Sequence, residues 1–129
     1  HAELQIDLRL LPGMDTDEVV ATLGERLQKV VAHCGTQLEF SAFYPPIPPF
    51  ETDIQGSLVQ TLAMESGNAP GTVAFGTEGF FLQSLGMETV IFGPGSIDQA
   101  HQPNEYLAKD QIDPATHVLR RVIEKYCVA

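Results

Sequence analysis

Two side chains capable of acid–base or metal chemistry, His101 and Glu105, lie in a long irregular stretch over residues 93–107. The stretch follows an apolar run at residues 89–92 and is rich in glycine, proline and amide side chains. Ordering a loop of this length is costly, so in a compact domain such loops usually carry function. Histidine is the commonest metal ligand among side chains and the readiest general base near neutral pH. We therefore take this loop as the first candidate for a functional site.

The residues alone do not decide whether His101 is a metal ligand, a general base or an ordinary surface residue. A lone loop histidine is often an ordinary surface or hydrogen-bonding residue, and a zinc site needs three or four ligands. The other histidines with a predicted context, His33 and His117, fall on expected helices. We interpret these two as surface positions or as charges at a helix end.

Glu78, Glu105 and Arg9 are the charged residues that could assist the loop histidine. Each glutamate follows a turn near the end of an expected strand, so both could face one crevice. Paired carboxylates can do acid–base work or orient a metal ligand, but the helix dipole explains a glutamate at a helix start equally well. Arg9 lies inside an apolar strand pattern. It could clamp a substrate carboxylate, or simply pair with Asp7 or Glu3 on the solvent face.

The elements that must position these residues alternate between strand and helix patterns. Period-two alternation and apolar runs predict four strands, at residues 3–10, 38–42, 72–75 and 89–92. Helical spacing and capping signals predict four helices, which begin after a cap at Asp15 and near residues 54, 80 and 113. This alternation indicates an α/β fold with a partly parallel sheet.

A proline-rich segment divides the chain. Four prolines occur within residues 45–49, which favours an extended connector and excludes helix. A recognition ligand for a proline-binding partner is the alternative interpretation. We predict one unit over residues 1–44, a linker over 45–53 and a second unit over 54–129.

Composition limits the classes of partner. Seven basic and seventeen acidic residues give a formal charge of -10. Nucleic acid and anionic membrane surfaces both require a basic protein surface, so we expect neither as a partner. Cys34 and Cys127 lack the spacing of a metal or redox motif, and we expect free thiols in a reducing, cytoplasmic compartment.

The loop sequence GPGSIDQAHQPNEYL at residues 93–107 resembles the last metal-ligand loop of the dinuclear-zinc amidohydrolases. This family contains acetylornithine deacetylases, succinyl-diaminopimelate desuccinylases, aminoacylases and carboxypeptidases of the glutamate-carboxypeptidase type. DLRLLPGM at residues 7–14 is similar to a strand and turn of the family's lid, or dimerisation, domain. PPIP at residues 45–48 and GTEGFF at residues 76–81 also match, and the extended similarity favours the acetylornithine deacetylase branch.

The resemblance implies a role for each candidate residue. His101 is expected to bind one of two zinc ions, which cobalt can replace, and Asn104 and Glu105 are expected to brace the loop. Arg9 and Glu78 are expected to contact the substrate. The implied reaction is hydrolysis of an N-acetyl amino acid by metal-activated water, giving ornithine and acetate in arginine biosynthesis.

The resemblance also implies an architecture and a missing part. Residues 1–44 are expected to form half of a ferredoxin-like lid, strand–helix–strand, and residues 54–129 the C-terminal α/β part of a catalytic domain. The family's general base and its other metal ligands lie upstream of the lid segment, so no catalytic base is expected in this chain. We therefore expect a C-terminal part of a homodimeric enzyme, inactive without its missing N-terminal portion.

Two alternatives remain open at the level of sequence. The first is a related N-acyl-amino-acid deacylase or desuccinylase. The second is a non-catalytic module that self-associates through an exposed strand edge at residues 4–10.

Overall fold

The computed structural model describes residues 1–128 of the 129-residue chain. The chain divides into two compact units, His1–Glu51 and Thr52–Ala129. The division falls at the proline-rich segment, and the assignment of the two units to a lid and a catalytic part stays a prediction. Within residues 1–128, no helix combines the length and the apolar character needed to cross a membrane.

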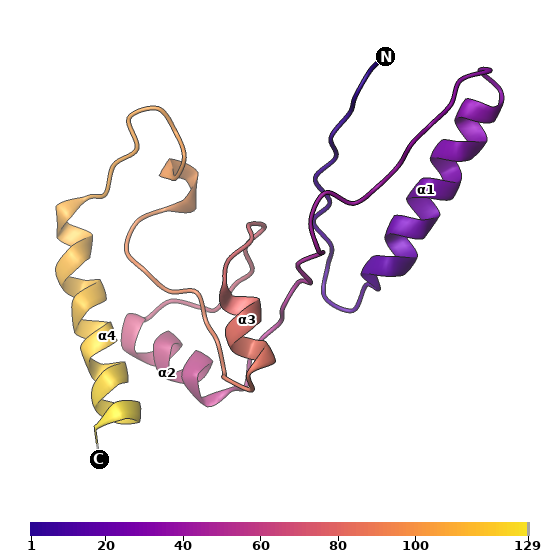
Figure 1. Cartoon of the computed structure of the whole chain (residues 1–129). Coiled ribbons are helices and arrows are strands. Elements are labelled where there is room, and N and C mark those ends of the chain that lie inside the picture. The colour runs from indigo at the N-terminus through magenta and orange to yellow at the C-terminus, as the bar shows by residue number, and fades with distance from the viewer. Residues whose placement is uncertain (129) are drawn as a thin grey trace. The chain divides into compact units, whose positions relative to one another are not determined.

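The first unit contains one helix, α1 (Thr16–Ala32), shown in Figure 1. The Asp15 side chain caps it by accepting a hydrogen bond from the backbone N–H of Glu18 at 3.0 Å. This contact satisfies one of the N–H groups that a helix start leaves without an internal partner. The helix ends before Gly35, whose φ of +66° suits glycine better than other residues. The predicted cap at Asp15 is therefore confirmed.

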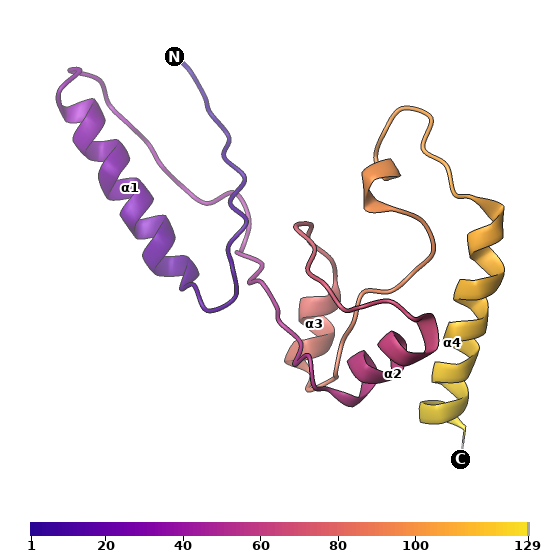
Figure 2. The same ribbon diagram turned by 180° about the vertical axis from the view of Figure 1, so that it is seen from behind.

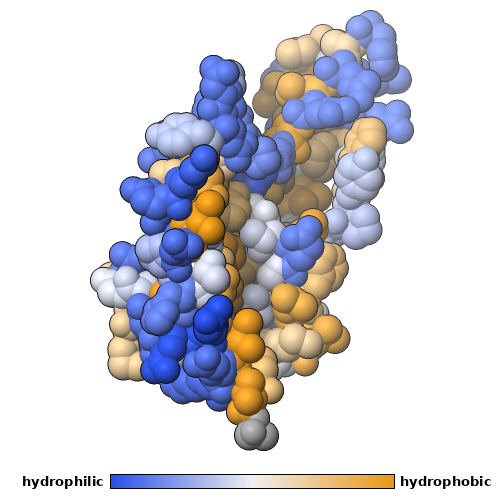
Figure 3. Space-filling view, turned by 90° about the vertical axis from the view of Figure 1, so that its left-hand side faces the viewer, coloured by the Kyte–Doolittle hydropathy of each residue, from blue (hydrophilic) through white to orange (hydrophobic). Residues whose placement is uncertain are grey.

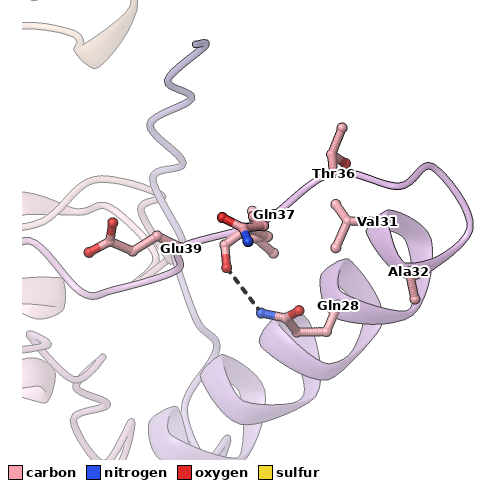
Figure 4. A pocket seen from close by; sticks show the side chains of 7 residues that line it. Gln28, Val31, Ala32, Thr36, Gln37 and Glu39 are labelled. Carbon is pink, nitrogen blue, oxygen red and sulfur yellow. Dashed lines mark hydrogen bonds between the residues drawn. The ribbon is translucent and has the colours of Figure 1, made fainter.

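The segment after α1 runs back along the helix. Gln28 Nε2 donates to the carbonyl of Leu38 at 3.3 Å (Figure 4). The Phe40 ring lies over Gly24, 3.2 Å from the position that a Cβ at residue 24 would occupy. Between helix and segment lies a groove of about 440 Å³, lined by Gln28, Val31, Ala32, Thr36, Gln37, Leu38 and Glu39. No residue of α1 is fully buried, so this unit is held together by partial burial.

The predicted α/β fold is wrong for the described residues. Residues 1–128 contain no strand, so neither the strand–helix–strand half of a ferredoxin-like lid nor an α/β catalytic part is present. A strand requires a neighbouring strand that completes its ladder of hydrogen bonds, and sequence alternation reports only which face is apolar. The alternating apolar side chains of the first segment are not covered by a neighbouring strand. Their exposed fractions are 82% for Leu4, 48% for Ile6 and 43% for Leu8.

The second unit contains the other helices, α2 (Ser57–Ser66), α3 (Gly79–Ser84) and α4 (Ile112–Cys127), with short 3₁₀ turns η1 (Ile97–Gln99) and η2 (Lys109–Gln111). The helices predicted in this part of the chain are confirmed, with boundaries shifted by a few residues. The last helix begins at Ile112, so Asp113 lies in its first turn and is not its cap.

Helices α2 and α4 lie side by side in both ribbon views (Figures 1 and 2) and form the core of the second unit. Among the described residues, the buried apolar side chains are Val59, Leu62, Ala115 and Val118. The spacing of three residues within each helix places each pair on one helix face. Not all apolar side chains are buried, since Figure 3 shows hydrophobic residues (orange) at the surface beside hydrophilic ones (blue).

A distant carboxylate caps the start of α2. Glu88 Oε1 accepts a hydrogen bond from the backbone N–H of Leu58 at 2.9 Å, and Glu88 Oε2 accepts one from the Ser57 hydroxyl at 3.2 Å. Nearby, the Thr52 hydroxyl donates to the carbonyl of Thr89 at 2.5 Å. Negative charge at a helix N-terminus is favoured by the helix dipole and by the exposed N–H groups. The Glu88 contacts therefore hold the segment that precedes the loop at residues 93–107 against α2.

A polar network joins the first turns of α2 to the end of α4. Tyr126 Oη lies 2.9 Å from Thr61 Oγ1 and donates to Ser57 Oγ at 3.3 Å. Lys125 Nζ donates to Thr61 Oγ1 at 2.7 Å. The hydrogen bond with Ser57, the one with Thr61 and the charge of Lys125 together lower the pKa of Tyr126 below its ordinary value of 10.0. Burial opposes this shift.

We expect the phenolate of Tyr126 to form at a lower pH than in an unfolded chain. Because the folded-state pKa is the lower one, the phenolate stabilises the fold fully above pH 10.0, and this stabilisation is lost as the pH falls through the folded-state pKa. Ultraviolet titration of the phenolate band, with the Tyr126→Phe spectrum subtracted, measures the midpoint. Ser57→Ala should move that midpoint upward, and an unchanged midpoint contradicts the network.

Candidate functional site

The loop at residues 93–107 is closed at its neck by contacts around Gly95. The backbone N–H of Gly95 donates to Gln111 Oε1 at 2.7 Å, and a Cβ on Gly95 would lie 3.3 Å from Leu107 Cδ1. Gly95 has a φ of +101°, a conformation that side chains rarely allow. Segments that enter and leave the loop therefore meet at this glycine.

The first half of the loop is more regular than the sequence predicts. Ser96 caps the 3₁₀ turn η1 by accepting a hydrogen bond from the N–H of Asp98 at 3.3 Å. Serine hydroxyls favour such local contacts with the backbone. The chain leaves this turn in an extended conformation at Ala100 and reaches His101.

The second half contains a tight turn over residues 102–105. Glu105 N–H donates to the carbonyl of Gln102 at 3.0 Å, and Asn104 has a φ of +63°. Proline at the second position and a residue tolerant of positive φ at the third are the requirements of a type II turn, and Pro103 and Asn104 meet them. The turn brings the Glu105 side chain back toward the histidine.

Glu105 holds the backbone of His101. Its Oε2 accepts a hydrogen bond from the His101 N–H at 2.9 Å. His101 has a φ of +59°, a left-handed conformation that is uncommon for residues other than glycine. A hydrogen bond to an ionised carboxylate is stronger than one between neutral groups, so it can offset part of the cost of that conformation. The imidazole lies on an exposed part of the loop.

The donor set for a metal is incomplete in the part of the chain that the structure describes. No group of three or more His, Cys, Asp or Glu side chains converges there. His101 offers one imidazole, whereas zinc in proteins takes three or four protein ligands. The described residues therefore do not fit a complete metal centre.

The two predicted substrate-binding residues, Arg9 and Glu78, lie in different units of the chain. Arg9 belongs to the first unit and pairs with Asp7, with 3.0 Å between Arg9 Nη2 and Asp7 Oδ2. Glu78 is exposed at the N-terminus of α3, where the Thr77 hydroxyl accepts the hydrogen bond from the N–H of Gly79 at 3.0 Å. Arg9 thus forms the local ion pair with Asp7 that was the alternative to substrate binding. The substrate roles of Arg9 and Glu78 stay predictions.

Sequence reasoning missed Gln111. Sixteen residues separate it from Gly95, and no spacing rule connects a glycine in a loop with a glutamine before a helix. The glycines and proline around Gly95 suggest a backbone conformation that other residues avoid. They do not identify Gln111 as the hydrogen-bond partner.

Comparison with curated proteins finds acetylornithine deacetylases. The chain is 38% identical to the one from Edwardsiella ictaluri (strain 93-146) and 40% identical to the one from Vibrio vulnificus (strain CMCP6), over 125 residues in each case. These matches cover 97% of this chain but 32% and 33% of the relatives. The enzyme of Klebsiella pneumoniae (strain 342) matches at 38% over the same length. The chain thus spans about a third of the length of the curated relatives it matches.

A family model described as peptidase family M20/M25/M40 matches residues 9–125. The match includes the complete loop with His101 and extends from Arg9 into α4. Members of this family are hydrolases that generally use metal ions. With a match over most of its length, the chain belongs to peptidase family M20/M25/M40.

Proposed function

We propose that this chain is a C-terminal part of a zinc-dependent N-acetylornithine deacetylase. The reaction adds water across the acetyl amide bond and releases acetate and ornithine. Zinc lowers the pKa of bound water and polarises carbonyl groups, which is the chemistry that amide hydrolysis requires. The remaining ligands and the general base would come from a part of the protein that precedes the described residues.

One observation carries the proposal. The identity of 38–40% to acetylornithine deacetylases extends over 97% of this chain, so it includes both units and the loop. The loop geometry adds support, because Glu105 fixes the backbone of an exposed histidine in an uncommon conformation. Such conformations concentrate at functional sites.

We assign the residues of the proposed site as follows. His101 is a ligand to one of two zinc ions, and Glu105 and Asn104 hold its loop. Arg9 and Glu78 contact the substrate once the remaining part of the protein is present. Arg9 would then exchange Asp7 for the substrate carboxylate, since the guanidinium fork binds carboxylates in two-point contacts.

A substrate panel tests the proposal. The protein as its own gene encodes it, loaded with zinc, is assayed with N-acetylornithine, N-acetylmethionine and N-succinyl-diaminopimelate. We expect the highest kcat/KM for N-acetylornithine, by about 10-fold or more, because a lost polar contact costs one to three kcal/mol. A preference for either other substrate supports a related deacylase in place of the deacetylase. The isolated 129-residue chain should be inactive.

We propose in addition that the enzyme is a cytoplasmic homodimer. Leu4, Ile6 and Leu8 expose apolar side chains in the first unit, and such surfaces favour association. Sedimentation velocity of the gene-encoded protein decides the oligomeric state, and a strictly monomeric species at micromolar concentration overturns this part. A dimer without any hydrolase activity would favour the non-catalytic module.

A further inference from the structure

Gln111 occupies the N-cap position of α4, yet its side chain does not cap that helix. No side-chain hydrogen bond from Gln111 to the first turn of α4 is present. Its amide oxygen instead accepts the N–H of Gly95 at 2.7 Å. Helix N-caps are normally serine, threonine, aspartate or asparagine, and a longer glutamine gains little there. Capping therefore does not explain glutamine at this position, whereas the contact with Gly95 does.

The contact ties the loop to the core of the second unit. Gln111 leads directly into α4, whose Ala115 and Val118 are buried against α2. Gly95 begins the segment that carries η1 and His101. Helix α4, which packs its buried residues against α2, is the rigid element here, and most loop side chains are exposed. The position of the loop relative to the core thus depends on its neck.

The neck and the tip of the loop form two successive clamps. At the neck, Gln111 and Leu107 meet Gly95. At the tip, Glu105 holds the N–H of His101. Because Leu107 follows Glu105 by two residues, movement at the neck is transmitted along a short segment to the tip. Small displacements at such a site have large effects, since ligand geometry tolerates only fractions of an ångström.

We propose that Gln111 is a positioning residue for the His101 loop. It acts through Gly95 and does not touch the reacting atoms. The inference rests on the proposed function for its catalytic consequence, but its structural part stands on the hydrogen bond alone.

Amide hydrogen exchange of the gene-encoded protein tests the clamp. Gln111→Ala should speed exchange at Gly95 by about 10-fold and at His101 by a few-fold, because the acceptor is gone and the neck opens. Gln111→Glu keeps an oxygen at the same reach and should restore slow exchange. Asp110→Ala, one residue earlier in η2, is the matched control and should leave both amides unchanged. Unchanged exchange at Gly95 in Gln111→Ala overturns the clamp.

Kinetics then test positioning. Gln111→Ala should lower kcat for N-acetylornithine by about 10-fold with KM nearly unchanged, and Gln111→Glu should recover most of it. Faster exchange at Gly95 with unchanged exchange at His101 and unchanged kcat overturns the positioning role. If the protein does not hydrolyse N-acetylornithine, the proposed function fails, while the exchange rates of Gly95 and His101 still decide the clamp.

Discussion

Replacing His101 with alanine should abolish measurable deacetylation and reduce the bound zinc. We expect kcat/KM to fall by at least about 100-fold, because loss of a metal ligand removes both the ion and its activation of water. The side chain is exposed and its N–H is held by Glu105, so the substitution creates no cavity in the core. Stability should therefore change little. Metal analysis and turnover of the gene-encoded protein measure the two effects separately.

His117→Ala is the matched control for this experiment. His117 is also exposed and also lies in the second unit, but on α4 outside the loop. Its replacement should leave metal content and turnover near those of the parent. Equal metal content and turnover in His101→Ala and in the parent would contradict the assignment of His101 as a ligand.

The helices were predictable because their signals are local. Asp15 caps the start of α1 through a hydrogen bond, and Gly35, with its positive φ, follows the end of the helix by a few residues. The strands were not, because a strand depends on a partner elsewhere. The alternation from Leu4 to Leu8 is equally clear in the sequence, yet no ladder forms among the described residues. Sequence periodicity shows which face of a segment is apolar, but it does not show whether a partner strand is available.

The loop shows the same division between local and distant information. The turn at residues 102–105 follows from Pro103 and Asn104, which are adjacent in sequence. The contact of Gln111 with Gly95 and that of Glu88 with α2 join residues 16 and 30 positions apart. Spacing rules for helices and turns extend over about four residues, so neither contact could be inferred from them.

We expect the second large effect on stability at Gly56, because the carboxylate of Glu88 lies next to it. Glycine to alanine at a residue with negative φ normally stabilises a protein by about 0.4–1 kcal/mol, and Gly56 has a φ of −57°. Here the added Cβ would overlap Glu88 Oε1 and would lie 2.9 Å from the carbonyl oxygen of Asp53. The carboxylate must then leave the N-terminus of α2, and we expect a loss of about 2 kcal/mol, the upper range for a helix cap.

Urea unfolding of Gly56→Ala and of three further variants separates the effect of the cap from that of the backbone. Gly71→Ala is the control, because nothing lies within 4 Å of its added Cβ, and it should be neutral or slightly stabilising. Glu88→Ala alone should cost about 1–2 kcal/mol of unfolding free energy. In the Glu88→Ala background, Gly56→Ala should cost clearly less than in the parent, since only the Asp53 carbonyl still opposes the new methyl group. Equal costs of Gly56→Ala in both backgrounds would show that the carboxylate of Glu88 does not hold the start of α2.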